Sequence, residues 1–481
     1  YDSSFYFDPR LEKYRESDPP KFPFWLTPDL QYVGAAWYQK EVEIPADWKK
    51  KHIHLFLERP HTETVLWVDE EKVGMQNTMV APHVYDLSEF LTPGKHMLTI
   101  RVDNRIKNVN VGLDAHSLTD HTQGNWNGII GKMKLVSSAS LYVQNVQVYP
   151  NLAEKKVDLE VILASDKEAK HTGEIIISGH SFNTDKESKI DSKSFNYDFN
   201  GNSDTLRLPI SMGDDFLTWD EFDPALYKLN IELSDSKSGK DEITLVFGMR
   251  EFKADGRSFT INNRPVFLRG TLDNAIFPLI GYPFMDVKSW LRVFRIIKEH
   301  GLNHVRYHSW CPPKAAFEAA DLSGIYLQPE GPSWANHSTA LGLGRPIDQF
   351  IYDETDKMKY YYGNSPSYCM LAYGNEPSGK QVEYLTAFNN YWKEKDNRRL
   401  YCGASVGGSW PIIPNNEYMV RGGARDINWK KTAPQTVADF SEEITPFKVP
   451  FVAHEMGQYC VFPDFDEIKK YTGVYKALNF E

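Results

Sequence analysis

Two glutamates each follow an apolar run in the second half of the chain. Glu376 lies in MLAYGNEPSG (370–379), and Glu455 lies in PFVAHEMG (450–457). Glycoside hydrolysis uses two carboxylates across a small cleft: one protonates the leaving oxygen, and the other attacks the anomeric carbon when the gap is about 5–5.5 Å. Two close carboxylates also raise the pKa of one of them, which keeps an acid protonated near neutral pH. The alternative is that each glutamate is a solvated turn residue.

Short apolar runs alternate with helical patterns after about residue 250, which predicts a parallel sheet with crossover helices. The carboxyl ends of the strands of a (β/α)8 barrel line one mouth, where active sites lie, so a barrel would bring the two glutamates together. A doubly wound sheet needs a glycine-rich phosphate turn after its first strand, and RGTLDNA (269–275) is not one. The expected strands are 265–270, 303–309, 325–330, 367–376, 399–405, 417–423 and 450–457, several ending in polar residues (Arg269, His308, Glu330, Glu376 and Glu455), and the expected helices are 286–301 and 312–324.

The spacing of these strands agrees with a barrel. The 187 residues between Leu268 and Glu455 correspond to about 31 residues for each of six strand–helix units, as in a barrel of about 250 residues. By the same step an eighth strand is expected at about position 486, beyond Glu481. We therefore expect a barrel over residues 250–481 that is truncated before strand eight; the alternative is a strand count that is off by one.

The first half of the chain has the two-residue period of half-buried strands. Residues 1–140 are interpreted as an antiparallel β-sandwich. Residues 141–249 have the pattern of an immunoglobulin-like sandwich, and the polar stretch 185–203 is expected to be a long hairpin. The strands expected in the first sandwich are 37–44, 52–58, 63–73 and 95–104, and those in the second are 141–150, 156–165, 172–181, 204–210, 226–235 and 241–250.

Composition argues against several classes of partner. The 54 Lys and Arg against 65 Asp and Glu give a net charge of −11, which argues against nucleic acid or an anionic membrane as the main partner. No run of 18 apolar residues is present, so no membrane span is expected.

The cysteines match no zinc or redox spacing and are expected to be buried free thiols; they are Cys311, Cys369, Cys402 and Cys460. The first residues show no signal peptide. The expected location is the bacterial periplasm or the cell exterior, after removal of such a peptide.

Five segments together resemble glycoside hydrolase family 2, the family of β-galactosidases, β-glucuronidases and β-mannosidases. The resemblance covers nearly the whole chain. It implies a jelly-roll sugar-binding domain over 1–140, an immunoglobulin-like sandwich over 141–249 and a (β/α)8 barrel over 250–481. The segments are VGAAWYQKEVEIP (33–45), WDEFDPALYKLNIEL (219–233), FGMREFKADGRSFTINNRPVFLRG (247–270), GNE (374–376) and HEMG (454–457).

The resemblance also implies roles for individual residues. Glu376 resembles the general acid/base, and Glu455 resembles the nucleophile of a retaining mechanism with a covalent glycosyl-enzyme intermediate. Asn375 resembles the residue that hydrogen-bonds the sugar 2-hydroxyl, a contact that strengthens in the transition state. Catalysis by this pair needs no redox or nucleotide cofactor, so none is expected.

The loop after the first predicted parallel strand departs from the family pattern, which often has a histidine soon after Arg-Gly. Here it reads RGTLDNAIFPLIGYP (269–283), and Asp273 or Asn274 is expected to bind the sugar instead. His308 is a further candidate for sugar binding; a histidine bonded within the barrel mouth fits equally well. Glu330 is a candidate as well. In some members an acidic residue nearby helps to bind a divalent cation, but no full ligand set can be assembled, so no metal is expected.

Aromatic side chains are candidates for the walls of a sugar site, although a tryptophan in this fold more often belongs to the core. The turn-rich segment 121–133, with Trp126, either approaches the active site or only closes the sandwich. The wall candidates are Trp310, Trp334, Trp410 and Tyr459, of which Trp334 and Trp410 lie in loops after strands.

The expected substrate is an oligo- or polysaccharide from which a terminal β-linked sugar is removed, galactose above all. No asparagine–lysine pair of the kind that β-glucuronidases use for the uronate carboxylate is found, which favours a neutral sugar. Arg345, Arg421 and Arg425 are nevertheless candidates for a carboxylate clamp. The alternatives are β-glucuronidase or β-mannosidase activity, and a non-catalytic carbohydrate-binding or scaffold protein, which would have no chemical need for both glutamates. Association into a homo-oligomer is left open.

Overall fold

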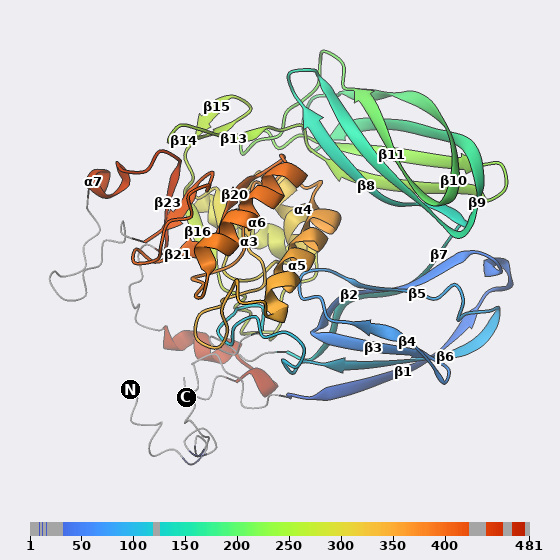
Figure 1. Cartoon of the computed structure of the whole chain (residues 1–481), viewed down its shortest axis with the longest axis horizontal. Helices are drawn as coiled ribbons and strands as arrows, with labels where there is room; N and C mark the ends of the chain where they lie inside the picture. Colours follow the sequence, from blue (N-terminus) through green and yellow to red (C-terminus); the bar gives the residue numbers. More distant parts are fainter. Residues whose placement is uncertain are drawn as a thin grey trace.

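The computed structural model describes residues 32–118, 126–422, 439–455 and 464–476, together with the single positions 9, 12 and 16. Its strands and helices form three groups (Figure 1). Two groups of antiparallel strands come from the first half of the chain, and a group of parallel strands with helices comes from the second half.

Two sheets enclose one apolar core in the first group. One sheet has the order β1-β6-β3-β4, and the other has the order β5-β2-β7. Alternate residues such as Ile53, Leu55 and Leu57 are buried in the shared core, as the two-residue period predicts. The strands are β1 (Ala35–Ile44), β2 (His52–His61), β3 (Glu63–Val68), β4 (Glu71–Gln76), β5 (His83–Asp86), β6 (Gly94–Asp103) and β7 (Gly128–Ser138), with a 3-10 helix at Ala46–Trp48.

The predicted strand 63–73 is in fact two strands. The chain turns at Asp69 and Glu70, where Asp69 adopts a φ of +54°, and β3 and β4 pair as an antiparallel hairpin. Aspartate tolerates this left-handed conformation better than most residues. Its Oδ1 also accepts a hydrogen bond from Met97 N (2.7 Å), which ties the turn to β6.

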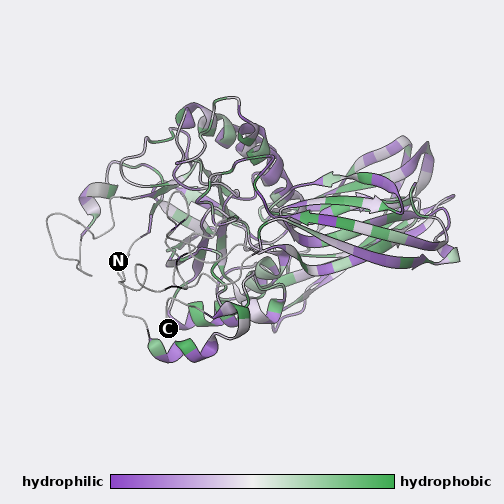
Figure 2. Cartoon of the chain, turned by 90° about the horizontal axis from the view of Figure 1, so that it is seen from below, coloured by the Kyte–Doolittle hydropathy of each residue, from purple (hydrophilic) through white to green (hydrophobic). Residues whose placement is uncertain are grey.

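One very long strand, β9, organises the second group. β9 pairs with β8, β10 and β11, and β11 pairs with β12, so that the sheet surrounds its own apolar core. The predicted strands 156–165 and 172–181 are parts of β9, and most of the stretch 185–203 is the first part of β10, paired to β9. Figure 2 shows apolar and polar residues alternating along the strands of the sandwiches. The strands are β8 (Leu141–Asn151), β9 (Lys156–Phe182), β10 (Lys189–Ser211), β11 (Leu226–Asp235) and β12 (Gly239–Phe247).

A small antiparallel sheet precedes the parallel strands. β13 (Phe252–Asp255), β14 (Ser258–Ile261) and β15 (Arg264–Val266) pair in sequence order. The position predicted for the first parallel strand, 265–270, is therefore wrong, because its first residues belong to β15 and the first parallel strand, β16, begins only at Gly270. Proline has no backbone N–H to donate, so Pro265 suits an edge strand such as β15.

Parallel strands then follow one another in sequence order. β16 pairs with β17, and β17 with β18; β18 meets β19 through single bridges; β19 pairs with β20; and β21, β22 and β23 pair in turn. Because Asn375 bridges to Ser405, β20 and β21 form one strand position beside β19. The described residues thus contain seven neighbouring parallel strand positions. The strands are β16 (Gly270–Asp273), β17 (His304–Tyr307), β18 (Tyr326–Pro329), β19 (Met370–Ala372), β20 (Leu400–Cys402), β21 (Ser405–Val406), β22 (Met419–Arg421) and β23 (Phe451–Ala453).

Helices connect most of the early parallel strands, and the two predicted helices are confirmed. α3 begins after Asp286, whose side chain accepts a hydrogen bond from Ser289 N (2.8 Å), and it buries Trp290 and Phe294. α4 ends at Gly324, whose φ of +66° suits glycine. The helices are α3 (Val287–Glu299), α4 (Lys314–Ser323), α5 (Pro346–Tyr362), α6 (Gln381–Lys395) and α7 (Ser441–Ile444), with 3-10 helices at Phe465–Lys470 and Gly473–Tyr475.

The structure bears on two further expectations, the state of the cysteines and the absence of a membrane-spanning helix. Cys311, Cys369 and Cys402 are buried free thiols, as predicted, and burial raises the pKa of each; Cys460 lies outside the described residues. Among the helices in the described ranges, none combines the length and the apolar character that a membrane crossing needs.

Buried charges join the second group to the parallel strands. Arg398 donates hydrogen bonds to Val148 O (3.0 Å) and Gln147 Oε1 (2.8 Å), and it pairs with Asp396 (2.8 Å). Burial opposes the ionisation of Asp396, but Arg399 and Arg398 outweigh it and hold the pKa of that carboxyl well below its usual range. These bonds therefore fix the two groups against each other.

Asp321 is a second buried carboxyl at this junction. Its Oδ1 accepts a hydrogen bond from Ser367 N (3.0 Å), and its backbone O accepts one from Trp219 Nε1 (2.8 Å). Burial raises the pKa of Asp321 to about 7. The folded chain thus holds this proton more tightly than the unfolded chain does, so ionisation of Asp321 costs stability as the pH rises from about 4 to about 7.

We predict that Asp321→Asn removes this cost. At pH 4 the melting temperature of the variant should be close to that of the wild type. At pH 8 it should be higher, with a gain in the free energy of unfolding of at most about 4 kcal/mol. Differential scanning calorimetry across this pH range measures the difference. Glu318→Gln, on the half-exposed side of the same helix, is the matched control and should show no such trend. An equal difference at both pH values for Asp321→Asn would contradict the prediction.

Candidate active site

Backbone strain gathers at the carboxyl ends of the parallel strands. Ala275, Ser309, Glu376 and Glu455 have φ values of +57°, +50°, +33° and +53°, and each lies two to four residues after β16, β17, β19 or β23. Non-glycine residues rarely adopt such angles, at a cost of about 1–3 kcal/mol each, and they persist where the surrounding structure imposes them, often at active sites. Both predicted catalytic glutamates are therefore strained residues at strand ends.

A buried ion pair between Arg306 and Glu330 lies among these ends. Arg306 Nε donates to Glu330 Oε1 (2.7 Å), and Arg306 Nη2 donates to Asn375 Oδ1 (2.7 Å). Glu330 is fully buried, and it also accepts hydrogen bonds from Ser309 N (2.7 Å) and Ser405 Oγ (2.5 Å). Burial opposes its ionisation, but the charge and hydrogen bonds of Arg306 prevail and lower the pKa of Glu330. Protein donors thus occupy the carboxylate of Glu330, and its contact with a sugar stays a prediction.

Basic side chains from the ends of two strands, β17 and β23, face Glu455. Its Oε1 lies 3.2 Å from His454 Nε2, 3.4 Å from His308 Nε2 and 3.8 Å from Arg306 Nη1. His454 Nε2 also lies 3.2 Å from Asn375 Oδ1. His454 and Arg306 therefore connect Glu455 to Asn375, the residue that precedes Glu376 in the chain.

Glu376 lies on the other side of Asn375. Its backbone N donates to Ser405 O (2.9 Å), and a Cβ on Gly407 would lie 3.1 Å from Glu376 Oε1 and 3.0 Å from the Trp410 ring. Trp410 Nε1 donates to Pro377 O (2.8 Å), which orients the indole beside Glu376. Trp410 is thus brought next to the predicted acid/base.

The side-chain nitrogen of Asn375, Nδ2, makes no hydrogen bond to any described residue. The side chain is fully buried, and its Oδ1 receives Arg306, but its Nδ2 finds no acceptor among the described residues. Leaving a buried N–H unpaired is costly unless a ligand or water accepts from it. The amide is therefore suited to donate to a polar group that enters the mouth.

His308 and Trp334 pack against each other with a centroid separation of 4.7 Å. Both meet a segment of the first group, residues 104–118, which we call the docking loop. His116 of this loop packs edge-on against His308 (4.6 Å), and its N donates to Ser309 Oγ (2.9 Å). Trp334 N in turn donates to Val111 O (2.9 Å). The docking loop thus covers one side of the strand ends.

The segment 121–133 was predicted either to approach the site or to close the sandwich, and its described part lies within the first group, where β7 pairs with β2. Residues 119–125 lie outside the described ranges, and Trp126 stacks on His61 (3.8 Å) within the first group. The described segment that contacts the strand ends is the docking loop, a few residues earlier in the chain.

The other predicted binding residues are more scattered. Asp273 ends β16, its Oδ1 accepts from Ala275 N (2.9 Å), and burial raises its pKa to about 6. Asn274 Oδ1 is buried and has no hydrogen-bond partner among the described residues. Trp310 is a core residue, 4% exposed, whose Nε1 donates to Asp273 O (3.1 Å). Tyr459 lies outside the described residues.

Two of the three arginines proposed as a carboxylate clamp lie among the described residues. Arg345 is exposed at the start of α5. Arg421 donates to Trp410 O (2.7 Å) and Gly408 O (2.5 Å), so it supports the loop that carries Trp410. Arg425 lies outside the described residues.

Sequence reasoning missed Arg306, His454 and the docking loop as parts of this site. A signal for Arg306 was present, because residues two apart on a strand share a face, and Arg306 and His308 are two apart. Gln328 and Glu330 repeat this spacing on the next strand, and Gln328 Nε2 donates to Glu330 Oε1 (3.3 Å). The docking loop had no comparable signal, since its role depends on how the first group packs against the third.

The fold and this network define a multidomain, β-rich protein with carboxylates at the ends of parallel strands. Two family models match consecutive parts of the chain: "Glycosyl hydrolases family 2, sugar binding domain" over residues 22–139 and "Glycosyl hydrolases family 2" over residues 141–250. Residues 22–139 and 141–250, a little under half of the chain, therefore match domains of glycosyl hydrolase family 2.

Individual proteins agree with the family. A β-galactosidase of Thermoanaerobacter pseudethanolicus is 25% identical over 323 residues, covering 65% of this chain and 41% of the relative. A β-galactosidase of Leuconostoc mesenteroides is 22% identical over 458 residues, which cover 91% of this chain and 42% of the relative. The crystal structure of a Bacteroides uniformis β-glucuronidase superposes with a TM-score of 0.66 at 18% identity. The superposition covers 78% of this chain and 46% of the β-glucuronidase chain. The chain spans about two fifths of the length of these curated relatives.

We predict that Gly112→Ala displaces the docking loop. Gly112 has a φ of +101°, and a Cβ there would lie 1.8 Å from Trp334 O, so the loop and the backbone at Trp334 cannot keep their contact. The variant should lose thermal stability and become more sensitive to proteolysis within 104–118, as measured by limited trypsin digestion and mass spectrometry.

Gly94→Ala is the matched control. Gly94 also has a positive φ, +125°, but an added Cβ would have no neighbour within 4 Å, so only about 1 kcal/mol of backbone cost is expected. Equal effects of the two substitutions would contradict the proposed docking.

Proposed function

We propose that this chain carries the active site of an exo-acting, retaining β-glycosidase, with Glu455 as nucleophile and Glu376 as general acid/base. One observation carries the proposal: Glu455 shares His454 and Arg306 with Asn375, the residue before Glu376, at the carboxyl ends of parallel strands. Carboxylates about 5–5.5 Å apart suit a double displacement with a glycosyl-enzyme intermediate. The names of the relatives, β-galactosidase and β-glucuronidase, support the same class of reaction.

The proposed mechanism assigns each step to a residue. Glu376 protonates the leaving oxygen while Glu455 attacks the anomeric carbon; Glu376 then removes a proton from the water that hydrolyses the intermediate. Asn375 Nδ2, buried and uncommitted, is available to donate to the sugar 2-hydroxyl. His308 and His454 hold Glu455 Oε1 in place, and Trp410 and Trp334 supply apolar walls.

The proposed substrate is a neutral β-linked sugar at the end of an oligo- or polysaccharide, galactose first. In support, the guanidinium of Arg421, a candidate for binding a uronate carboxylate, already donates hydrogen bonds to two backbone carbonyls of the protein. A β-glucuronide is the second candidate, supported by the name of the B. uniformis structure. The glycoside is proposed to enter the mouth of a (β/α)8 barrel, of which the described residues supply seven parallel strand positions.

We predict different effects of Glu455→Gln and Glu376→Gln on aryl β-galactosides. Glu455→Gln should abolish release of every aryl group, because no nucleophile is left. Glu376→Gln should slow a poor leaving group by about 10²–10⁴-fold, the usual contribution of a general acid, and spare an activated nitrophenyl group in the first step. Steady-state kinetics with leaving groups of different pKa values measure this contrast.

Glu383→Gln, at an exposed position on α6, is the control and should behave as the wild type. The same assay with β-glucuronide and β-mannoside tests the choice of sugar, and proton NMR of the first product tests retention of the anomeric configuration. No release from any of these glycosides by the wild-type chain would overturn the hydrolase proposal and favour a non-catalytic binding protein.

A further inference from the structure

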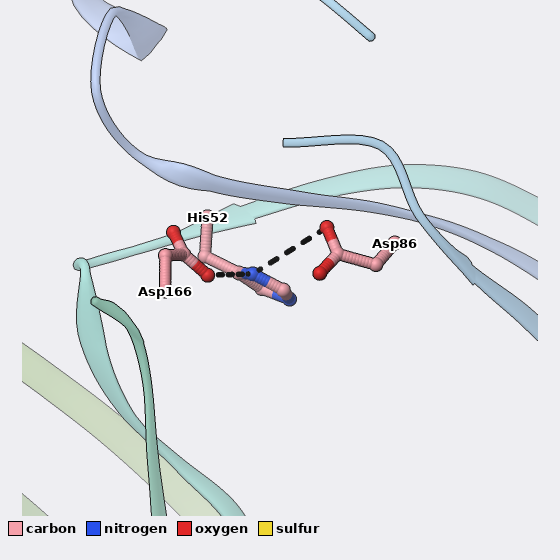
Figure 3. A group of neighbouring side chains, drawn as sticks. All are labelled: His52, Asp86 and Asp166. Carbon is pink, nitrogen blue, oxygen red and sulfur yellow. Dashed lines mark hydrogen bonds and ion pairs between the residues drawn. The ribbon is translucent and has the colours of Figure 1, made fainter. Parts of the chain in front are cut away.

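A second cluster of ligand-type side chains lies where the first two groups of strands meet, on elements that contribute nothing to the candidate active site. It consists of His52 at the start of β2, Asp86 at the end of β5 and Asp166 in β9. One ligand atom from each lies within 4.8 Å of the others (Figure 3). Among the described residues it is the only group of three histidine, cysteine or acidic side chains that meets this criterion.

The geometry of the cluster is close to that of a metal site. His52 Nδ1 lies 2.7 Å from Asp166 Oδ1 and 3.8 Å from Asp86 Oδ1, and both carboxylates approach the same ring nitrogen (Figure 3). Zinc bonds of about 2.0–2.2 Å at tetrahedral angles place neighbouring ligand atoms about 3.3–3.6 Å apart. Small side-chain rotations therefore suffice to place an ion between the three atoms.

The charge of the cluster also favours a cation. In the part of the chain that the structure describes, His52 is the only basic side chain within 4 Å of either carboxylate. Two aspartates thus share one imidazole, which carries at most a single positive charge. The histidine–aspartate pairs His96–Asp69 and His337–Asp114, by comparison, have one carboxylate each and lack this excess of negative charge.

Supporting contacts hold the ligands in place. The His52 ring stacks on Tyr142 (4.3 Å), which fixes its orientation. Ser88 donates to Asp86 Oδ1 through both its N (2.9 Å) and its Oγ (2.7 Å). Such second-layer contacts are typical of metal sites, where they orient the ligands.

An ion can reach the cluster from a cavity. A cavity of about 940 Å³ lies at the junction of the three groups of elements, and His52 and Asp86 are among its lining residues together with Tyr142 and Tyr360. It offers space for the water molecules that complete the coordination of an ion with three protein ligands.

We propose that His52, Asp86 and Asp166 bind a divalent transition-metal ion of the Zn²⁺ type that clamps the first two groups of strands together. The imidazole favours such an ion over Ca²⁺ or Mg²⁺, which prefer oxygen ligands alone. Binding replaces the Nδ1 proton that otherwise bonds to Asp166, and this proton passes to solvent. Sequence spacing gave no sign of the site, because its ligands are far apart in the chain and only the packing of two groups unites them.

The test is Zn²⁺ binding to the metal-free, full-length chain, measured by isothermal titration calorimetry and by metal analysis after dialysis. We expect one Zn²⁺ per chain, a higher melting temperature in its presence, and much weaker binding of Ca²⁺. Asp86→Asn is the first variant, since its side chain is 65% exposed and its loss does not threaten folding. It should weaken Zn²⁺ binding about ten-fold or more, and His52→Gln should abolish it.

Asp69→Asn, in the one-carboxylate pair with His96, is the matched control and should bind Zn²⁺ as the wild type does. The proposal is overturned if the wild type binds no Zn²⁺ at 100-fold molar excess, or if Asp86→Asn and His52→Gln bind it with unchanged affinity and the same gain in melting temperature. Because none of these readouts uses glycosidase activity, the result is independent of the proposed function.

Discussion

The ion pair between Arg306 and Glu330 is the interaction on which the candidate active site depends. Removing two charges from water is costly, and the cost is offset only by good geometry of the pair and by further hydrogen bonds to the buried groups. Here Glu330 is surrounded by donors from β17, β18 and β21, and Arg306 extends the network to Asn375 and towards Glu455. One buried pair thus fixes the relative positions of strand ends that are far apart in the sequence. Removal of either partner would leave an uncompensated buried charge.

The strain at the strand ends is sustained by the same packing. Positive φ angles at Ser309, Glu376 and Glu455 cost free energy locally. Hydrogen bonds donated by Ser309 N to Glu330 and by Glu376 N to Ser405 O hold the backbone in such conformations. The first group of strands adds a lateral constraint through the docking loop, which packs His116 against His308. The N-terminal sandwich therefore helps to shape a site whose carboxylates come from the other end of the chain.

The sequence predicted much of this arrangement, for identifiable reasons. Six of the seven parallel strands and both helices lie where apolar periodicity placed them, because buried strands and amphipathic helices leave local patterns. The errors arose where local pattern and pairing disagree: 265–270 was split between β15 and β16, and 63–73 turns at Asp69 into a hairpin. Glu330 was recognised as a candidate site residue, but its bonds to Arg306, Ser309 and Ser405 could not be foreseen, since they depend on packing between distant segments.

By itself, the sequence determined the order of the elements, the two-sandwich and parallel-strand organisation, and the presence of Glu376 and Glu455 after apolar runs. These features depend on residue type and spacing over a few neighbours. The tertiary structure decided which side chains meet: Arg306 with Glu330 and Asn375, the docking loop with the strand ends, and His52 with Asp86 and Asp166. Such contacts join residues separated by tens to hundreds of positions, and they exist only because hydrophobic packing of the three groups brings distant backbone segments within hydrogen-bonding distance.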